Sequence, residues 1–191
     1  MLALLYDTGI RLSELVGLRV SDVWLDDEPR VFVTGKGRKE RFVAIGATTV
    51  DHIRCTLECN HGPEPDPSAP LFFTVYGGKR RPMSSSNVQR IVARCADEAR
   101  SKVPTVPESV YPHMLRRTRA TDLYQGGAEI ELVSAVLGHE KVETTRVYAK
   151  PSTERMREVM EAASPVPAEA AEKPLWVGRE EELARLYGLR L

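Results

Sequence analysis

Glycines divide the second half of the chain into short helices. A helix predicted over residues 113–125 stops at Gly126, the next is expected over 129–137 and is closed by Gly138, and a third is expected over 141–148. Glycine ends helices readily because it adopts a left-handed backbone conformation without a Cβ clash. The stretch is therefore expected to fold as consecutive short helices.

These short helices carry four chemically active groups, namely His113, Arg116, His139 and Tyr148. A guanidinium can hold a phosphate through paired donors and stays charged at any relevant pH. Imidazoles exchange protons near neutral pH, and a phenol becomes a nucleophile when it ionises. The set is suited to attack on a phosphodiester.

A short amphipathic helix is predicted over residues 11–18, because its leucines and Val16 fall close to one face. Arg11 and Glu14 are three residues apart and are therefore neighbours on this helix. Taken alone, the two residues are interpreted as a surface ion pair, which contributes little to stability.

A β-hairpin with a basic turn is predicted next. Apolar and β-branched runs at 30–34 and 41–45 flank the sequence Gly-Lys-Gly-Arg-Lys-Glu. The glycines on both sides of Lys36 let the backbone approach a ligand and leave the amine projecting. The turn lacks the spacer and the Ser or Thr of a phosphate-binding P-loop, and alone it would be interpreted as a solubilising hairpin tip.

A helix predicted over 46–60 carries His52, Cys55 and Cys59 at spacings of three and four, and His61 follows. These residues could in principle bind zinc, but zinc ligands usually come in pairs on loops. A helix face with small thiols is the preferred interpretation, and no metal site is predicted.

The middle of the chain is basic. A strand is expected over 71–76, a basic turn over 79–82, and a helix over 87–101 that is N-capped by the preceding serines. Arg90 and Arg94 lie one turn apart on that helix, so both could reach a DNA backbone.

Charge distribution separates this region from the end of the chain. Net charge is zero, but residues 79–119 hold ten Lys or Arg against three acidic residues, whereas 151–191 hold six basic and eight acidic residues. This contrast fits a nucleic-acid face, and a solvated charged surface is the alternative. No apolar run is long enough to cross a bilayer, no signal peptide is visible, and the three cysteines form no secreted disulfide framework. A cytoplasmic protein without membrane contact is expected.

Taken together, the motifs resemble the tyrosine recombinases, which include phage integrases, Xer-type resolvases and the integrases of conjugative transposons. The matching segments occur in the order and spacing of that family and cover nearly all of residues 1–150; they are TGIRLSEL at 8–15, GKGRKER at 35–41, HMLR at 113–116, LGH at 137–139 and TTRVY at 144–148. The resemblance implies a mainly helical α+β catalytic domain with a small antiparallel sheet on one side.

The resemblance also implies the roles of individual residues. The implied catalytic set is Arg11, Lys36, His113, Arg116, His139 and Tyr148, with Glu14 in a supporting position. The residues expected to contact DNA are Arg38, Lys39, Arg41, Lys79, Arg80, Arg81, Arg90, Arg94 and Arg117.

By the same resemblance, the protein would be a site-specific recombinase or integrase that breaks and rejoins DNA through a 3′-phosphotyrosine bond. No metal, ATP or other cofactor is implied. The partners would be a double-stranded recombination site and further copies of the chain, as a tetramer on DNA and a monomer when free. A bacterial mobile element is the favoured source.

The expected organisation has three parts. Residues 1–163 would be the catalytic domain, without the N-terminal core-binding domain usual in the family. Residues 164–174, rich in Pro, Ala and Glu, would be a linker, and 175–191 a helix that packs either in cis or on a neighbouring subunit. As an isolated catalytic part, the chain is expected to be weakly active.

Two other functions remain open. A type IB topoisomerase uses similar groups, although the Gly-Lys-Gly hairpin and the Leu-Gly-His motif favour a recombinase. A non-catalytic DNA-binding fragment is the second alternative. The target sequence, and the choice among integration, excision and dimer resolution, do not follow from the motifs.

Overall fold

The computed structural model describes residues 1–139, 143–146 and 157. Residue contacts divide the chain into two units, Met1–Lys150 and Pro151–Leu191, and the elements below all belong to the first. The predicted linker at 164–174 and the predicted helix at 175–191 lie outside the described residues.

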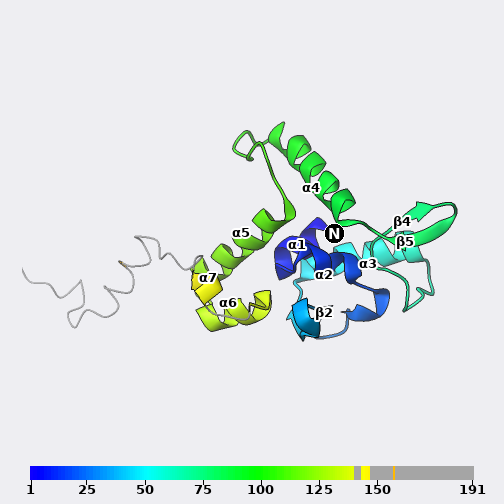
Figure 1. The fold of residues 1–191 in the computed structure, drawn as a ribbon, viewed down its shortest axis with the longest axis horizontal. Helices are drawn as coiled ribbons and strands as arrows, with labels where there is room; N and C mark the ends of the chain where they lie inside the picture. Colours follow the sequence, from blue (N-terminus) through cyan, green and yellow to red (C-terminus); the bar gives the residue numbers. More distant parts are fainter. Residues whose placement is uncertain (140–142, 147–156, 158–191) are drawn as a thin grey trace, which may run out of the picture. The chain divides into compact units, whose positions relative to one another are not determined.

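Helices make up most of the first unit (Figure 1). They are α1 (Leu2–Thr8), α2 (Leu12–Gly17), α3 (Ala47–His61), α4 (Ser85–Arg100), α5 (Pro112–Gln125), α6 (Ile130–Leu137) and α7 (Glu143–Arg146), with 3₁₀ turns η1 (Val20–Asp22) and η2 (Lys36–Arg38). No helix in the part of the chain described is long and apolar enough to span a membrane.

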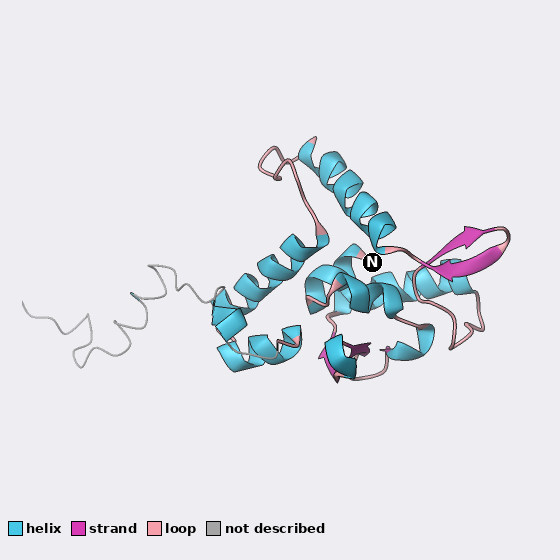
Figure 2. Cartoon of the chain, viewed as in Figure 1, coloured by secondary structure: helices cyan, strands magenta, loops and turns pink. Residues whose placement is uncertain are grey.

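Two small antiparallel sheets accompany the helices (Figure 2). One sheet has the order β1 (Val23–Trp24), β2 (Arg30–Thr34), β3 (Glu40–Ala44), and the other pairs β4 (Phe73–Tyr76) with β5 (Lys79–Pro82). The mainly helical α+β fold and the first hairpin are confirmed. The second sheet contains the strand expected over 71–76, which pairs with residues 79–82.

The basic turn predicted over 79–82 is in fact strand β5. The turn lies at Gly77 and Gly78, whose φ angles of 57° and 72° suit the tight turn of a two-residue hairpin. Tyr76 therefore pairs directly with Lys79. Basic side chains on this segment extend along an exposed strand instead of clustering at a loop tip.

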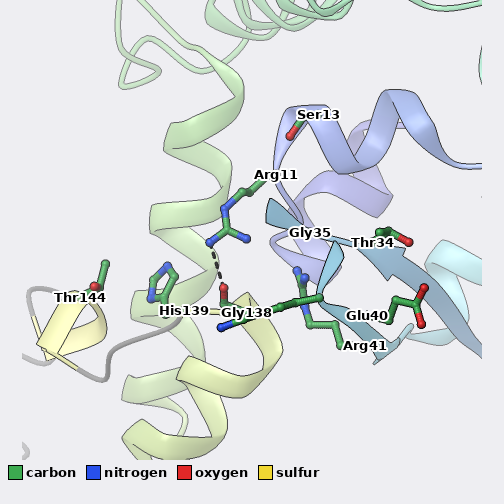
Figure 3. A pocket seen from close by; sticks show the side chains of 10 residues that line it. Arg11, Ser13, Thr34, Gly35, Glu40, Arg41, Gly138, His139 and Thr144 are labelled. Atoms are coloured by element: carbon green, nitrogen blue, oxygen red, sulfur yellow. Dashed lines mark hydrogen bonds between the residues drawn. The ribbon is translucent and has the colours of Figure 1, made fainter. Parts of the chain in front are cut away.

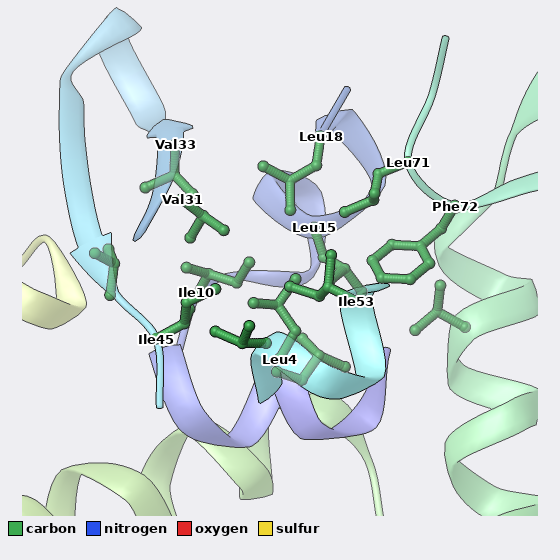
Figure 4. Packing of buried hydrophobic residues seen from close by; sticks show 14 of the residues in the cluster. Leu4, Ile10, Leu15, Leu18, Val31, Val33, Ile45, Ile53, Leu71 and Phe72 are labelled. Atoms are coloured by element: carbon green, nitrogen blue, oxygen red, sulfur yellow. The ribbon is translucent and has the colours of Figure 1, made fainter. Parts of the chain in front are cut away.

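The main core lies between α1, α2, α3, α4 and the β2–β3 hairpin (Figure 4). Leu4, Leu15, Val31 and Ile53 are fully buried there. Leu15 comes from the helix predicted to be amphipathic, and Ile53 from the buried face of α3. The alternating burial of β2 explains how a short strand contributes to this core while Thr34 stays exposed.

The end of α1 fixes the position of α5. Gly9 ends α1 with φ 59°, and a Cβ at this position would lie 2.7 Å from Cδ2 of Leu137. Arg116 Nη1 donates to the Gly9 carbonyl at 2.5 Å, and Arg119 Nε donates to the Asp7 carbonyl at 2.8 Å. Two cations of α5 thus meet the negative end of α1, where the helix dipole favours them.

A smaller cluster fixes α6 on α5. Ala120 of α5 and Val133 and Leu137 of α6 are buried together. Gly138 then ends α6 in the left-handed conformation, with φ 64°. Both helix ends predicted from glycine, at Gly126 and at Gly138, are therefore present.

Candidate active site

Arg11 connects the first helices to the end of α6. Its backbone is extended at the N-cap of α2, and its Nη2 donates to the Gly138 carbonyl at 2.9 Å (Figure 3). Its Nη1 lies 3.0 Å from Oε1 of Glu14, and about a third of the side chain is exposed. The guanidinium is therefore held at the edge of a pocket and remains accessible from it.

The interpretation of Arg11 and Glu14 as a surface pair is wrong. The Glu14 side chain is only 1% exposed, and its two oxygens accept from both Arg11 and Arg41. Burial by itself raises the pKa of the carboxyl, but hydrogen bonds from the Arg41 side chain and the Arg11 backbone N–H outweigh it and lower the pKa. Glu14 is thus an ionised, buried anchor for two arginines.

Arg41 has a different environment from the DNA contact that was predicted. Its Nη1 and Nη2 donate to Glu14, and its Nε donates to the Val136 carbonyl at 3.1 Å. A Cβ at Gly138 would lie 2.7 Å from the Arg41 Cζ. The geometry is that of a strut between α2, the hairpin and α6, which explains why only 15% of the side chain is exposed.

Arg116 is buried, with 3% of the residue exposed. Besides its bond to Gly9, its Nη2 donates to the Leu137 carbonyl at 2.7 Å. It lines a pocket of about 160 Å³ together with Arg11 and His113. The two arginines of the predicted set, one at the N-cap of α2 and one on α5, therefore meet at one pocket.

His113 is the second residue of α5 and follows Pro112, which occupies the first helical position. Partial burial, followed by the positive charges of Arg116, Arg117 and Arg11, lowers the pKa of its imidazole. A neutral imidazole can accept a proton from a nearby group.

His139 lies directly after Gly138 and lines a larger pocket of about 950 Å³ with Arg11, Arg41 and Lys39. Desolvation, followed by the charges of Arg116 and Arg11, lowers the pKa of His139 to about 4. The imidazole is therefore neutral at pH 7. Its Nδ1 lies 2.8 Å from Oγ1 of Thr145, which is 1% exposed.

Thr145 was not predicted as a site residue. It belongs to the Thr-Thr pair in the segment quoted for the resemblance, but the sequence alone does not distinguish a buried threonine from its exposed neighbour. Thr144 is exposed and Thr145 is buried. Only the packing of α7 against α6 makes this difference.

Lys36 lies in η2, between β2 and β3. Gly35 closes the hairpin by donating its N–H to the Lys39 carbonyl at 2.7 Å, and Gly37 and Arg38 have φ angles of 75° and 59°. Gly35 and Lys39 line the same pocket as Arg11 and His139. The backbone of the hairpin therefore lies beside His139, whereas Tyr148 lies outside the described residues.

Most of the residues predicted to contact DNA are exposed, unlike Arg41. The exposed ones are Arg38, Lys39, Lys79, Arg80, Arg81, Arg90, Arg94 and Arg117. On the second hairpin, the Arg81 guanidinium lies over the Tyr76 ring and that of Arg80 over Phe73. Their role in DNA binding stays a prediction.

The two cysteines of α3 lie on its exposed face. Cys55 and Cys59 are exposed with their Sγ atoms 3.8 Å apart. No group of three or more His, Cys, Asp or Glu side chains that could hold a metal occurs among the described residues. His61 is bonded through Nε2 to the Leu71 carbonyl and packs edge-on against Phe73.

The fold and this convergence of arginines and histidines define a tyrosine-recombinase catalytic domain. Residues 1–155 match the phage integrase family, and the chain belongs to that family. The predicted family is thus confirmed.

Relatives at the sequence level are Xer recombinases. The chain is 39% identical over 165 residues to tyrosine recombinase XerC of Corynebacterium glutamicum, covering 86% of this chain and 50% of the relative. It is 35% identical over 172 residues to XerD of Mycobacterium leprae, covering 86% and 51%. The chain therefore spans about half the length of the curated relatives it matches.

Solved structures agree with the sequence comparison. The XerA recombinase matches with a TM-score of 0.68 and 28% identity, over 86% of this chain and 57% of that chain. The XerH site-specific recombinase bound to its difH substrate, in the pre-cleavage complex, matches with a TM-score of 0.65 and 26% identity, over 84% and 44%.

Proposed function

We propose that this chain carries the catalytic part of a site-specific DNA recombinase or integrase, which breaks and rejoins DNA through a covalent phosphotyrosine. The observation that carries the proposal is the meeting of Arg11 and Arg116 at one pocket, next to His113, although one arginine caps α2 and the other lies on α5. Arg11 also reaches Gly138, which is 127 residues away along the chain, and so extends the site to His139.

In the proposed mechanism, Arg11 and Arg116 bind the non-bridging oxygens of the scissile phosphate. Paired N–H donors suit this anion, and they stabilise the further negative charge of the pentavalent transition state. Glu14 and Arg41 act in support, because their hydrogen bonds hold Arg11 and the hairpin in place.

Tyr148 is proposed as the nucleophile. Its oxygen forms a bond to phosphorus while the bond from phosphorus to the 5′ oxygen breaks. His113 is suited to accept the phenolic proton, because its pKa is lowered and it is neutral near pH 7. Lys36 is proposed to give a proton to the departing 5′ oxygen, and neutral His139 to donate a hydrogen bond to a phosphate oxygen.

The covalent intermediate keeps the energy of the broken bond. A 5′ hydroxyl of another strand can then attack the phosphotyrosine and restore a phosphodiester, with tyrosine as the leaving group. The reaction as proposed needs neither ATP nor a metal ion. Cleavage is therefore expected to continue in EDTA.

The proposed substrate is double-stranded DNA, contacted by the exposed basic residues around the pockets. The names of the relatives support a function in recombination. We extend this proposal to an assembly of four copies of the chain on DNA. The proposed location of the reaction is the cytoplasm. The segment at 175–191 is proposed to pack on the body in cis or on a neighbour in trans.

A covalent-capture experiment tests the proposal. The chain is incubated with a library of nicked duplexes with randomised arms, and protein-linked DNA is recovered from a denaturing gel and sequenced. Wild type is expected to give a covalent band, and Tyr148→Phe none. Absence of the band in wild type, or its persistence in Tyr148→Phe, would overturn the mechanism, and sequence-independent relaxation of plasmid would indicate a topoisomerase instead.

A second substrate tests whether Lys36 is the general acid that protonates the departing 5′ oxygen. Lys36→Ala is expected to lose cleavage of ordinary DNA and to regain it when the 5′ leaving group is a thiolate, which needs no proton. Equal loss on both substrates would make Lys36 a binding residue and not the acid.

A further inference from the structure

Thr145 has an environment that the proposed reaction does not yet explain. It lies on the four-residue helix α7 and is 1% exposed. Its neighbour Thr144 is exposed and lines the larger pocket. A hydroxyl buried this deeply needs a hydrogen-bond partner, and Oγ1 has one in Nδ1 of His139, at 2.8 Å.

The bond to Thr145 determines which nitrogen of His139 serves the pocket. In Figure 3 the His139 ring lies between Thr144 of α7 and Arg11, and it is one of the pocket's lining groups. Because Nδ1 is used by Thr145, a bond from the ring to a ligand in this pocket would be made through Nε2. The two ring nitrogens are thus distinguished by the contact of Nδ1 with the buried hydroxyl of Thr145.

The protonation state of the ring then follows from the ligand. His139 is neutral at pH 7, so one of its nitrogens carries a proton and the other is an acceptor. A phosphodiester oxygen only accepts hydrogen bonds, so a ring that binds it must carry its proton on Nε2. Nδ1 must in that case accept, and a threonine hydroxyl can supply the donor.

We propose that Thr145 is a positioning residue, which donates its hydroxyl proton to His139 Nδ1 and thereby holds the Nε2–H tautomer toward the phosphate. The inference rests on the proposed function for the identity of the ligand. It adds a physical link between the phosphate site and the segment that leads to the predicted nucleophile, since Thr145 precedes Tyr148 by three residues in the sequence.

Valine has nearly the shape of threonine but has no hydroxyl, so Thr145→Val removes the hydrogen bond and keeps the packing volume. Thr145→Ser keeps the hydroxyl and removes a methyl group. A matched control is Thr56→Val on α3, since the Thr56 hydroxyl bonds to the His52 carbonyl at 2.7 Å on an exposed face. Circular dichroism and thermal unfolding of each variant check that it is folded.

The first test measures the tautomer directly and needs no DNA. Nitrogen-15 NMR of the chain at pH 7, with the His139 signals assigned through His139→Gln, is expected to show a protonated Nε2 and an accepting Nδ1 in wild type, Thr145→Ser and Thr56→Val. Thr145→Val is expected to give a mixture of tautomers. A protonated Nδ1 in wild type, or an unchanged ring in Thr145→Val, would overturn the inference whether or not the chain cleaves DNA.

The second test measures the cleavage rate of bound DNA at saturating protein. Thr145→Val is expected to lower it about tenfold to a hundredfold, as loss of outer partners does for other functional histidines, while DNA affinity stays unchanged. Thr145→Ser is expected to restore the rate. A wild-type rate in Thr145→Val would overturn the positioning role, whereas an inactive wild type would overturn the proposed function and leave the tautomer measurement to decide this inference.

Discussion

Arg41 Nη2 lies 2.9 Å from Glu14 Oε2, and this contact joins strand β3 to helix α2 inside the protein. The same arginine donates through Nε to the Val136 carbonyl near the end of α6. Three segments distant in sequence are thus connected through one side chain. Arg11 caps α2 and His139 follows the end of α6, so Arg41 connects the two segments next to these residues.

Removing this strut should cost stability. Arg41→Ala is expected to lower the free energy of unfolding by about 3 kcal/mol, because it leaves the Glu14 carboxylate buried with one fewer partner. Arg41→Lys is expected to recover only part of the loss, since an ammonium cannot reach both segments with a planar fork. Urea unfolding measures both variants.

The exposed pair of Arg30 with Asp26 provides the control. Asp26→Asn is expected to cost less than about 1 kcal/mol in the same assay. Equal losses of unfolding free energy at the buried and exposed pairs would contradict the structural role assigned to Arg41.

Gly138→Ala tests how closely Arg41 passes under the end of α6. A Cβ at this position would lie 2.7 Å from both Cζ and Nη1 of Arg41, and φ is 64°. We expect a cost of about 1–2 kcal/mol for the left-handed backbone and at least about 1 kcal/mol more for the clash. Gly77→Ala is the matched control, since φ is 57° and nothing lies within 4 Å, so a similar loss in both variants would exclude the clash.

Stability should depend on pH through His139. Its pKa is lowered from 6.5 to about 4 in the folded protein, so the unfolded chain binds more protons between these two values. The free energy of unfolding therefore falls as the pH falls from 6.5 toward 4. His113, whose pKa is also lowered, contributes in the same direction.

The Glu14 carboxyl affects stability in a different pH range. Its pKa is lowered from 4.5, so its contribution to the free energy of unfolding is lost only as the pH falls below about that value. Urea unfolding at pH 7 and pH 5 is expected to show a smaller difference for His139→Gln than for wild type. An identical difference in both proteins would assign the pH dependence to other groups.

Salt dependence distinguishes phosphate contacts from structural arginines. Arg81→Gln and Arg90→Gln are each expected to reduce the slope of log K for duplex DNA against log salt concentration by about 0.9, as expected for one lost phosphate contact. Arg41→Gln and the α3 variant Arg54→Gln are expected to leave the slope unchanged, because neither side chain is proposed to contact phosphate. A reduced slope for Arg41→Gln would support the predicted contact of Arg41 with DNA.

Much of the fold follows from local patterns. Ser84 caps α4 by accepting from the Asn87 N–H, and Gly9 and Gly138 end their helices in left-handed conformations, all of which local chemistry predicts. The first hairpin follows from β-branched runs around a glycine turn. The second hairpin was not predicted, because the segment from Lys79 to Pro82 is basic and lacks the apolar residues typical of a strand. Its pairing with Phe73–Tyr76 across the turn at Gly77 and Gly78 makes it a strand.

The sequence by itself determined which chemical groups are present, their order, and the class of domain that carries them. Tertiary structure decided what each group does in its surroundings. Glu14 became a buried anchor and Arg41 a strut, because charges removed from water must find partners, and those partners come from distant segments. Whether Thr145 or Thr144 faces His139 depends on how α7 packs, which adjacent identical residues cannot reveal before the chain is folded.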